Sequence, residues 1–383
     1  MHPIYLDYNA TTPVDPGVLE AMLPYLREEF GNPFSAHALG RRAHEAVERA
    51  RADVAALLGA HPDEIVFTSG GTEASNIAIR GAAAAEPARS AIVTTAIEHP
   101  ATTACCDLLR AVGHRVTEVR PQPDGTVEPD DVAAAISTRT ALVTIIHAQN
   151  EIGTIQPVRA IAGVARERGA LVHADAAQSA GKIAFTVDEL GVDLMSIAGH
   201  KLYAPKGVGA LYIRRGVTLP GLLRGAGQEA GRRPGTENVA GIVALGEACR
   251  IAALHLEKGT HATAQLASMM VDRLRDQVPG LTVVGENAPR LPNTLNVLFP
   301  HASGRKLLAA CPRVLASTGS ACHADSEAPS AIQIALGLPP ERALGAVRLT
   351  LGRSTTAQDI EAASSSLAAA WRIVREYAPA SAS

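Results

Sequence analysis

Short apolar runs alternate with amphipathic stretches over the first two thirds of the chain. Three stretches have the spacing of helices, at residues 50–59, 73–85 and 157–169. Continuous apolar runs bounded by helices are typical of strands that are buried on both faces of a sheet. The pattern therefore predicts an α/β domain with a largely parallel sheet and helices on both faces. The six runs that we expect to be its strands are EIVFTS (64–69), SAIVTTA (90–96), ALVTIIHA (141–148), ALVHADAA (170–177), DLMSIAG (193–199) and GALYIRR (209–215).

The pattern changes near residue 255. A helical stretch at 263–278 is followed by the shorter apolar runs LTVVG, TLNVLF and AVRLTLG, and then by a final helical stretch at 357–377. A chain of 383 residues is also too long for one ordinary hydrophobic core. We expect a large domain over residues 15–255 and a smaller α+β domain made of residues 1–14 and 256–383.

Composition narrows the class of protein. Hydrophobic residues make up 47% of the chain and charged residues 19%, which is typical of a soluble globular protein. The net charge of −3 does not indicate the strongly basic surface that is typical of nucleic-acid-binding proteins. The N-terminus, MHPIYLDYNATTP, has no basic leader, and no uncharged apolar stretch is long enough to span a bilayer. We therefore expect a cytoplasmic protein that binds neither nucleic acid nor a membrane directly.

The cysteines fit the same picture. Five cysteines, an odd number, without a secretory signal indicate reduced thiols. No CxxC pair is present, so we expect neither structural zinc nor another bound metal. Cys105, Cys106 and Cys249 lie in helical or apolar surroundings, where buried and inert thiols are usual. Cys322 instead stands beside His323 in the small and polar run STGSACHADSEAPS, which makes it the candidate nucleophile.

Polar residues follow the strands at the edge of the sheet where open α/β folds bind ligands. Gly71 and Thr72 open a helix after the first strand, and a helix N-terminus suits a phosphate. An ordinary turn and helix cap would use the same two residues. Asp175, flanked by alanines, would be costly to bury unless it met a cation, although it could also cap the next helix. The other strand ends supply His99, Asn150, Gln178, His200 and Lys201.

Lys201 is the most informative of these residues. It is one of only five lysines in the chain, whereas arginine supplies almost all the other positive charge. Arginine stays charged, but a lysine with a lowered pKa can lose its proton and form a Schiff base. A Schiff-base lysine, an acid for a ring nitrogen and a phosphate site are what pyridoxal phosphate requires. Taken together, the strand-end residues predict a pyridoxal phosphate site.

Eight motifs carry a family resemblance. YLDYNATTP, FTSGGTEASN, EHPA, AQNEIGTIQPV, HADAAQSAGK, AGHKLYAPKGVGALYIRR, RPGTEN and STGSACH resemble, in this order, those of the cysteine desulfurase and selenocysteine lyase family. These are pyridoxal-phosphate enzymes of the class V aminotransferase group. The similarity runs from Tyr5 to about Thr356. It implies a homodimer with the fold type I architecture, in which a large mixed, mostly parallel sheet domain carries a smaller α+β C-terminal domain.

The resemblance implies a role for each matching residue. Lys201 matches the lysine that binds the cofactor as a Schiff base, and Cys322 matches the nucleophile that takes up sulfur as a persulfide. Asp175 matches the partner of the ring nitrogen, and Gln178 that of the ring's phenolic oxygen. His99 matches the imidazole that stacks on the ring and is placed to move protons. The further cofactor contacts are Gly71, Thr72, Asn150, His200 and, from the second subunit, Thr236, while the substrate contacts are Asn32, Asn150 and Arg348.

The activity implied is the conversion of L-cysteine to L-alanine. The sulfur would pass from Cys322 to an acceptor or scaffold protein for iron–sulfur clusters, tRNA or DNA modification. Ala198 departs from the pattern, because many desulfurases have a serine there whose hydroxyl reaches the phosphate. CHAD and RLPNT also resemble the selenocysteine lyase branch, so selenium release from L-selenocysteine is the alternative. An aminotransferase would leave Cys322 without a role, and a silent scaffold would not need Lys201 and Asp175.

Overall fold

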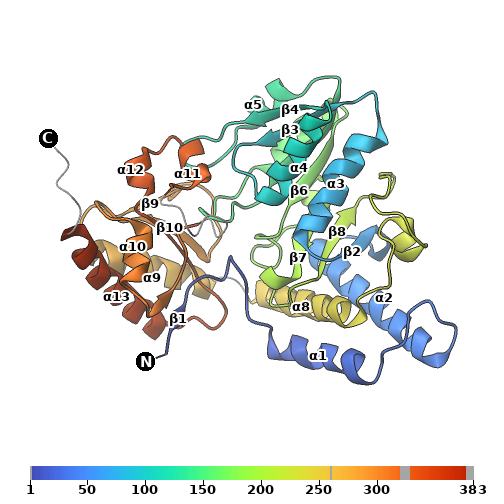
Figure 1. Ribbon diagram of the computed structural model, residues 1–383, viewed down its shortest axis with the longest axis horizontal. Coiled ribbons are helices and arrows are strands. Elements are labelled where there is room, and N and C mark those ends of the chain that lie inside the picture. Colours follow the sequence, from blue (N-terminus) through green and yellow to red (C-terminus); the bar gives the residue numbers. More distant parts are fainter. Residues whose placement is uncertain (1, 259–260, 320–327, 377–383) are drawn as a thin grey trace.

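Two sheets organise the protein, a seven-stranded sheet in the larger body and a three-stranded sheet in the smaller one (Figure 1). The computed structural model describes residues 2–258, 261–319 and 328–376. In the large sheet β8 runs antiparallel to both of its neighbours, and all other neighbours are parallel. The mixed, mostly parallel sheet that the sequence predicts is confirmed. Its strands, in spatial order, are β2 (Ile65–Thr68), β8 (Gly209–Ile213), β7 (Leu194–Ala198), β6 (Leu171–Asp175), β5 (Thr140–Ile146), β3 (Ala91–Thr95) and β4 (Arg115–Val119).

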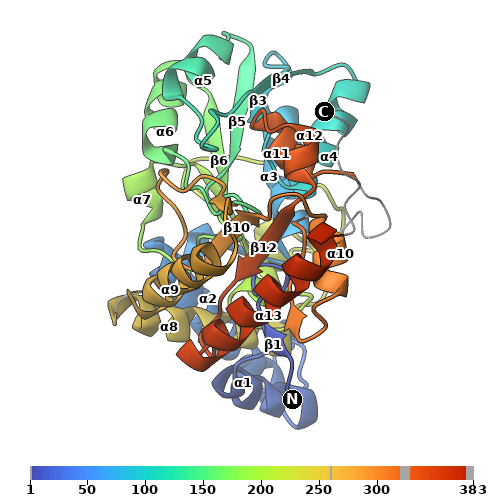
Figure 2. The same cartoon turned by 90° about the vertical axis from the view of Figure 1, so that its left-hand side faces the viewer.

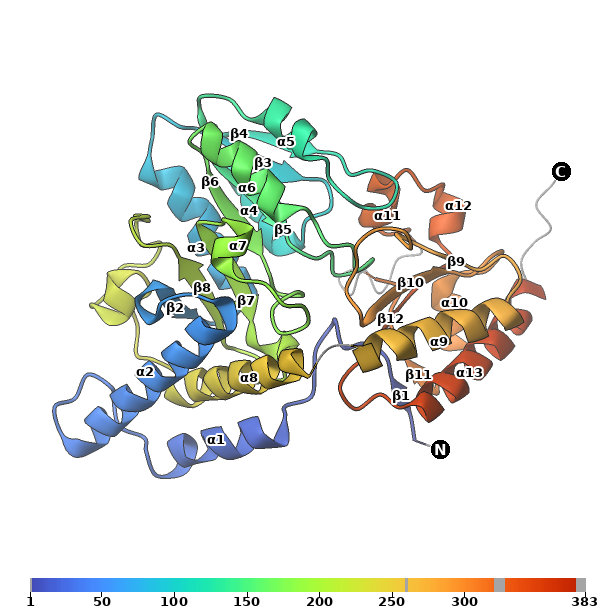
Figure 3. The same ribbon diagram turned by 180° about the vertical axis from the view of Figure 1, so that it is seen from behind.

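Helices cover both faces of this sheet, as Figures 1 and 3 show from opposite sides. α3 (Gly71–Ala85) and α4 (Pro100–Ala111) pack on one face, where Cys105 and Cys106 are buried. The other face carries a larger apolar cluster that includes Cys249. The thiols of all three cysteines are therefore buried, as expected. The helices of the second face are α1 (Pro16–Arg27), α2 (Ala38–Leu58), α5 (Pro129–Ala135), α6 (Val158–Glu167), α7 (Val187–Leu190) and α8 (Val239–Glu257).

Helix α8 is the most apolar of the long helices. By length and composition alone it could cross a membrane, but half of it is buried inside the protein. It packs against α1 and α2, and Ala244, Leu245 and Ala248 are fully buried there. Its apolar character is therefore that of a core helix.

The smaller body contains an antiparallel sheet with helices packed on it (Figure 2). Its hydrophobic cluster joins Phe299 and Trp371 from the C-terminal part to Ile4 and Leu6 from the N-terminus. The N-terminal segment then passes between the two bodies (Figure 1). The elements of this body are β9 (Thr282–Val283), β10 (Thr294–Leu298), β12 (Ala346–Thr350), the parallel pair β1 (Ile4–Tyr5) and β11 (Val314–Leu315), and helices α9 (His261–Gln277), α10 (Gly304–Ala309), α11 (Ala331–Ala335), α12 (Pro340–Ala343) and α13 (Ala357–Glu376).

The apolar pattern predicted six of the seven large-sheet strands and missed β4. In β4 only Val119 is buried, and Arg115 and Glu118 are exposed. A strand with one neighbour and half-exposed side chains does not produce a continuous apolar run. The first half of α2 was also missed, because five of residues 41–49 are charged and, apart from Val47, their apolar residues are alanines.

A buried ion pair fixes the chain around β2. Arg51 of α2 and Glu229 form two hydrogen bonds of 2.9 Å, and both side chains are nearly buried. The pair also meets the backbone of β2, since Arg51 donates to the Ile65 carbonyl at 2.8 Å and the Phe67 N–H donates to Glu229 at 2.8 Å. Glu229 and the following Ala230 have positive φ angles of 48° and 53°. The ion pair therefore holds a strained turn against the sheet.

We expect Arg51→Met to lower the free energy of unfolding by about 3–5 kcal/mol, because it leaves the buried Glu229 carboxylate without its partner. Urea denaturation followed by circular dichroism measures the change. The matched control is Arg275→Met, which removes an exposed ion pair with Glu286 and should change the same free energy by about 0–1 kcal/mol. Equal effects of the two substitutions would contradict the importance of the Arg51 pair.

Candidate active site

Four of the predicted site residues lie at one edge of the large sheet. Strands β3, β5, β6 and β7 are parallel, so their carboxyl ends meet at the same edge. His99 follows β3, Asn150 follows β5, Asp175 ends β6 and Lys201 lies three residues beyond β7. His99 and Lys201 are close enough to Asp175 for their charges to lower the pKa of its carboxyl group. The structure therefore brings these residues together.

The amine of Lys201 is held by backbone oxygens. Lys201 ends the short 3-10 turn Gly199–Lys201, and its Nζ donates to the carbonyls of Asn9 at 2.6 Å and Ala10 at 2.7 Å. Burial and the nearby guanidinium of Arg348 lower the pKa of Lys201 to about 8. The neutral, nucleophilic amine is therefore available at mildly alkaline pH.

Asp175 supplies a buried carboxylate. The residue is 5% exposed, and its Oδ1 accepts the Ala177 N–H at 3.0 Å. In the described part of the chain no side chain donates to it. Burial raises the pKa of this carboxyl, while the nearby imidazole of His99 and amine of Lys201 act in the opposite direction. Such a carboxylate is suited to holding a proton on a ligand nitrogen.

His99 caps α4 and presents a neutral ring. Its Nδ1 accepts the Ala101 N–H at 3.1 Å, which leaves the ring proton on Nε2. Burial lowers the pKa of His99. The preceding Glu98 is buried, and its Oε1 accepts from the Thr95 hydroxyl at 2.5 Å and the Ile146 N–H at 2.9 Å. Glu98 thereby ties the loop that carries His99 to β5, and burial raises its pKa to about 8.

The start of α3 forms an open cradle. Gly70 caps this helix with a φ of 151°, and no side chain there bonds the first helical N–H groups. A side chain added at Gly70 would meet nothing within 4 Å, so the space before the helix is free. A Cβ at Gly71 would lie 3.4 Å from the side chain of Ala198, and Thr72 follows. Unpaired N–H groups at a helix N-terminus suit an anion such as a phosphate.

His200 directly precedes Lys201 in the chain. Burial, followed by the charge of Lys201, lowers the pKa of His200 to about 4. The ring is therefore neutral at physiological pH and has one N–H to donate. Its backbone carbonyl accepts from both the N–H and the hydroxyl of Thr12, at 3.0 and 3.1 Å. The N-terminal segment thus also supports the turn that carries Lys201.

Gln178 is held at both ends of its amide. Its Nε2 donates to the Asn9 carbonyl at 2.9 Å, and its Oε1 accepts from the amine of Lys182 at 2.8 Å. Lys182 also donates to Oδ1 of Asn9 at 3.0 Å. Gln178 and Lys201 therefore meet at the same carbonyl oxygen.

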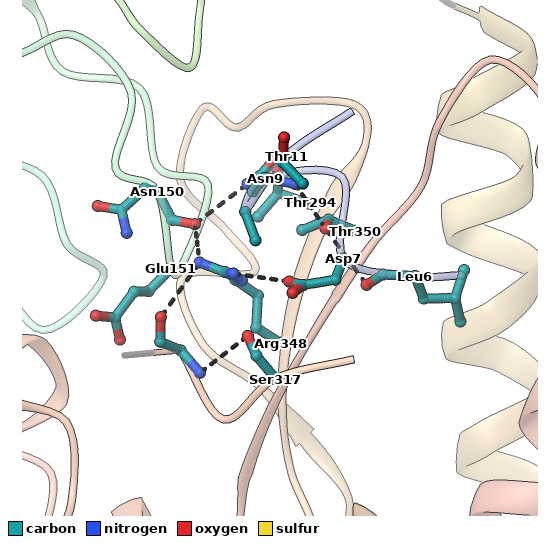
Figure 4. A network of polar contacts seen from close by, with 12 residues as sticks. Leu6, Asp7, Asn9, Thr11, Asn150, Glu151, Thr294, Ser317, Arg348 and Thr350 are labelled. Carbon is teal, nitrogen blue, oxygen red and sulfur yellow. Dashed lines mark hydrogen bonds and ion pairs between the residues drawn. The ribbon is translucent and has the colours of Figure 1, made fainter. Parts of the chain in front are cut away.

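Arg348 of β12 reaches the site from the smaller body (Figure 4). It is 3% exposed and pairs with Asp7 at 2.8 Å. Its NH1 group donates to the carbonyls of Asn150 and Gly319, both at 3.2 Å, while its buried Nε has no hydrogen-bond partner among the residues that the structure describes. The guanidinium is thus placed at the junction of the two bodies and retains one unused donor.

The predicted nucleophile Cys322 lies outside the described residues. The residues on either side of that segment contact the site. Gly319 accepts from Arg348, and the Ser330 hydroxyl donates to the buried Glu151 carboxylate at 2.6 Å. The chain therefore leaves and rejoins the described structure beside Arg348 and Glu151.

Two predicted site residues are not brought to this group within one chain. Thr236 is exposed in the loop before α8, and Asn32 is exposed in the loop after α1. The carboxamide oxygen of Asn32 accepts the N–H of Phe34 at 3.0 Å.

Sequence reasoning did not select Asp7, Asn9 and Lys182. All three fall in quoted motifs, since Asp7 and Asn9 belong to YLDYNATTP and Lys182 ends HADAAQSAGK. None of the three directly follows a strand that the apolar pattern predicts, so the strand-end rule gave no reason to place them in the site. The available signal was the rarity of lysine, which had drawn attention to Lys201 and applies equally to Lys182.

Three observations indicate that these residues fit pyridoxal phosphate. The buried Asp175 carboxylate has no side-chain donor in the described structure, the cradle before α3 is open, and Lys201 has a lowered pKa beside them. Within residues 2–258, 261–319 and 328–376, no group of three or more His, Cys, Asp or Glu side chains could hold a metal ion. The arrangement is that of a cofactor site built around an amine.

Comparison with known proteins identifies the family. The aminotransferase class-V family matches residues 4–363. A cysteine desulfurase from a Nostoc species is 45% identical over 363 residues, which cover 94% of this chain and 91% of that protein. A NifS-like protein superposes with a TM-score of 0.91 at 36% identity, covering 97% of this chain and 100% of its own. For SspA in complex with cysteine the TM-score is 0.81 at 37% identity, covering 91% and 98%. The resemblance carried by the motifs is thereby confirmed, and the chain belongs to the class-V aminotransferase family and to its pyridoxal-phosphate-dependent cysteine desulfurases.

Proposed function

We propose that the protein is a cysteine desulfurase that converts L-cysteine to L-alanine and retains the sulfur on Cys322 as a persulfide. The observation that carries the proposal is the Lys201 amine, with its pKa of about 8, beside the buried carboxylate of Asp175. In the reaction the carbon–sulfur bond of the substrate breaks and a sulfur–sulfur bond forms at Cys322. A proton replaces sulfur on the substrate carbon, so the step needs no external oxidant or reductant.

The residues of the site would hold the cofactor by its distinct groups. The N–H groups of Gly71 and Thr72 and the ring of His200 suit the phosphate, and Asp175 suits the protonated ring nitrogen. His99 would stack on the ring, and Gln178 would donate to the phenolic oxygen. When bound, pyridoxal phosphate supplies an electron sink for the pair left when the substrate loses its α-proton.

The chain's own groups then bind the substrate and move its protons. Neutral Lys201 Nζ is the base for the α-proton, and His99 Nε2 is the second proton carrier. Arg348 would bind the substrate carboxylate through its unused donor, with the side chain of Asn150 beside it. Because Asp7 already pairs with Arg348, the substrate carboxylate would share the guanidinium rather than replace its counter-ion.

We further propose a homodimer in which the exposed residues serve the partner's site. Thr236 would reach the phosphate of the other subunit, and Asn32 would approach its substrate. Large exposed apolar side chains support such an interface. Leu26, Phe30 and Phe34, which are 60–73% exposed, lie on the segment that carries Asn32.

The sulfur would leave Cys322 for an acceptor or scaffold protein that serves iron–sulfur cluster assembly or the thiolation of tRNA or DNA. We place the protein in the cytoplasm, because its four described cysteines are free thiols.

We expect Cys322→Ala to keep the cofactor's visible absorbance and to lose alanine formation from L-cysteine by at least about 100-fold, since sulfur bound to carbon leaves poorly without a nucleophile. Alanine is measured in single-turnover reactions, and sulfide is measured after a thiol reductant has been added to release it from the persulfide. Selenium leaves more readily, so cleavage of L-selenocysteine should fall much less. An equal loss on both substrates would favour a dedicated selenocysteine lyase, and surviving desulfuration would contradict the persulfide mechanism.

Lys201 should be the residue that binds the cofactor. In cofactor-free protein, the rate of loading should rise with pH and level off above about 8, where the Lys201 amine has lost its proton. A lysine with the ordinary value of 10.5 would still gain rate above that pH. Absorbance follows the loading, and borohydride reduction with peptide mapping locates the label. Lys206→Ala, an exposed control, should load normally, and a label on Lys206 would overturn the assignment.

Mixed dimers test whether the site is shared. Lys201→Ala and Thr236→Asp should each have little activity alone, because the aspartate would repel the phosphate. If Thr236 acts across subunits, a mixed dimer contains one site with both changes and one site with neither. An equal mixture after subunit exchange should then recover roughly a quarter of the wild-type activity. Activity no higher than the average of the two parents, with exchange verified, would argue that each site is built from one chain.

A further inference from the structure

We propose that Lys182 is a positioning residue, which orients the amide of Gln178 so that its N–H groups face the cofactor's phenolic oxygen. This inference rests on the proposed function, because it concerns a residue expected to contact pyridoxal phosphate. Lys182 lies on the segment that follows β6, four residues beyond Gln178.

Within the described residues Lys182 makes two hydrogen bonds, both to neutral amide oxygens. Its Nζ lies 2.8 Å from Oε1 of Gln178 and 3.0 Å from Oδ1 of Asn9. In the described parts of the chain no carboxylate lies within ion-pairing distance of the amine. The charged groups that act on it are Lys201 and Arg348, and burial together with these two charges lowers the pKa of Lys182 well below its ordinary value. A surface charge or an ion pair therefore does not explain this lysine.

The contact determines which end of the Gln178 amide points where. Charged or neutral, the amine of Lys182 carries N–H groups, and at 2.8 Å from Oε1 of Gln178 it is placed to donate to that oxygen. Lys182 thus fixes Oε1 of Gln178 on its own side, and Nε2 must occupy the opposite side. Lys182 and the Asn9 carbonyl therefore hold the two ends of the amide in the same orientation. Without Lys182, only the Asn9 carbonyl would favour this orientation, and the terminal torsion of Gln178 would be less restricted, since such torsions are broad and roughly two-fold.

The position of Nε2 matches the phenolic oxygen. Nε2 of Gln178 and Nζ of Lys201 both donate to the Asn9 carbonyl, at 2.9 and 2.6 Å, so the two donors are neighbours. In pyridoxal phosphate the phenolic oxygen lies on the ring carbon next to the one that bears the aldehyde, which is the group a lysine amine attacks. A hydrogen-bond donor beside the lysine nitrogen is therefore placed to reach the phenolic oxygen.

The experiment titrates the visible absorbance band of the cofactor-loaded protein against pH. A donor to the phenolic oxygen stabilises the form that has lost its proton, so removing that donor raises the midpoint. Lys182→Met keeps the length of the side chain but donates to neither amide. We expect it to raise the midpoint by about 1–2 pH units, corresponding to one hydrogen bond to a charged group.

A double-mutant cycle separates positioning from general damage. Gln178→Leu should raise the midpoint to the same extent, and Lys182→Met combined with Gln178→Leu should add nothing further. The matched control is Lys206→Met, the same substitution at an exposed lysine, which should leave the midpoint at the wild-type value. A lysine that only stabilised the fold would lower the unfolding midpoint in urea without moving the absorbance midpoint.

Three results would be decisive. An unchanged midpoint in Lys182→Met, with Gln178→Leu shifted, overturns the positioning role and leaves the proposed function intact. A wild-type protein that never acquires the absorbance band overturns the proposed function itself. If Lys182→Met does not fold, Lys182→Ala replaces it, because Lys182 borders a cavity of about 120 Å³ that can take up water. Its midpoint should rise and return towards wild type with added ethylamine, and no shift in this variant likewise overturns the proposal.

Discussion

The side chain of Asn9 is a buried contact that joins the two bodies of the protein. Its carboxamide oxygen accepts from Lys182 at 3.0 Å and from Asn293 at 3.2 Å. Its nitrogen donates to the Thr294 hydroxyl at 2.9 Å and to the Asn150 carbonyl at 3.1 Å. Lys182 and Asn150 belong to the larger body and the other two residues to the smaller one. Since a buried amide that loses a partner is destabilising, the two bodies keep one relative position while all four bonds are satisfied.

The same arrangement determines the balance of charges in the candidate site. Lys182, Lys201 and Arg348 lie close together, and the carboxylates near them are Asp7 and Asp175. Neighbouring positive charges and burial lower the pKa values of both amines. A ligand that brings a phosphate and a carboxylate would relieve the same repulsion. The site thus combines two requirements, a nucleophilic amine and affinity for anions, in one distribution of charge.

The sequence predicted the parts of the site that local rules control. An apolar run followed by a polar residue predicted that His99, Asp175 and Lys201 lie at one edge of the sheet, and the structure has them there because parallel strands place their ends at one edge. The contacts of Asn9 could not be predicted in this way, since it meets Lys182 across 173 positions and Asn293 across 284. Only packing of the N-terminal segment between the bodies brings such residues together.

The ion pair of Arg51 and Glu229 also determines how the large sheet can meet other chains. A terminal strand offers free N–H and carbonyl groups to any strand that approaches it, which is a common route to aggregation. On β2 the pair occupies the Ile65 carbonyl and the Phe67 N–H. On β4, at the other end of the sheet, the exposed side chains include Arg115 and Glu118. The occupied backbone groups of β2 and the exposed charges of β4 both disfavour the addition of a further strand to the sheet.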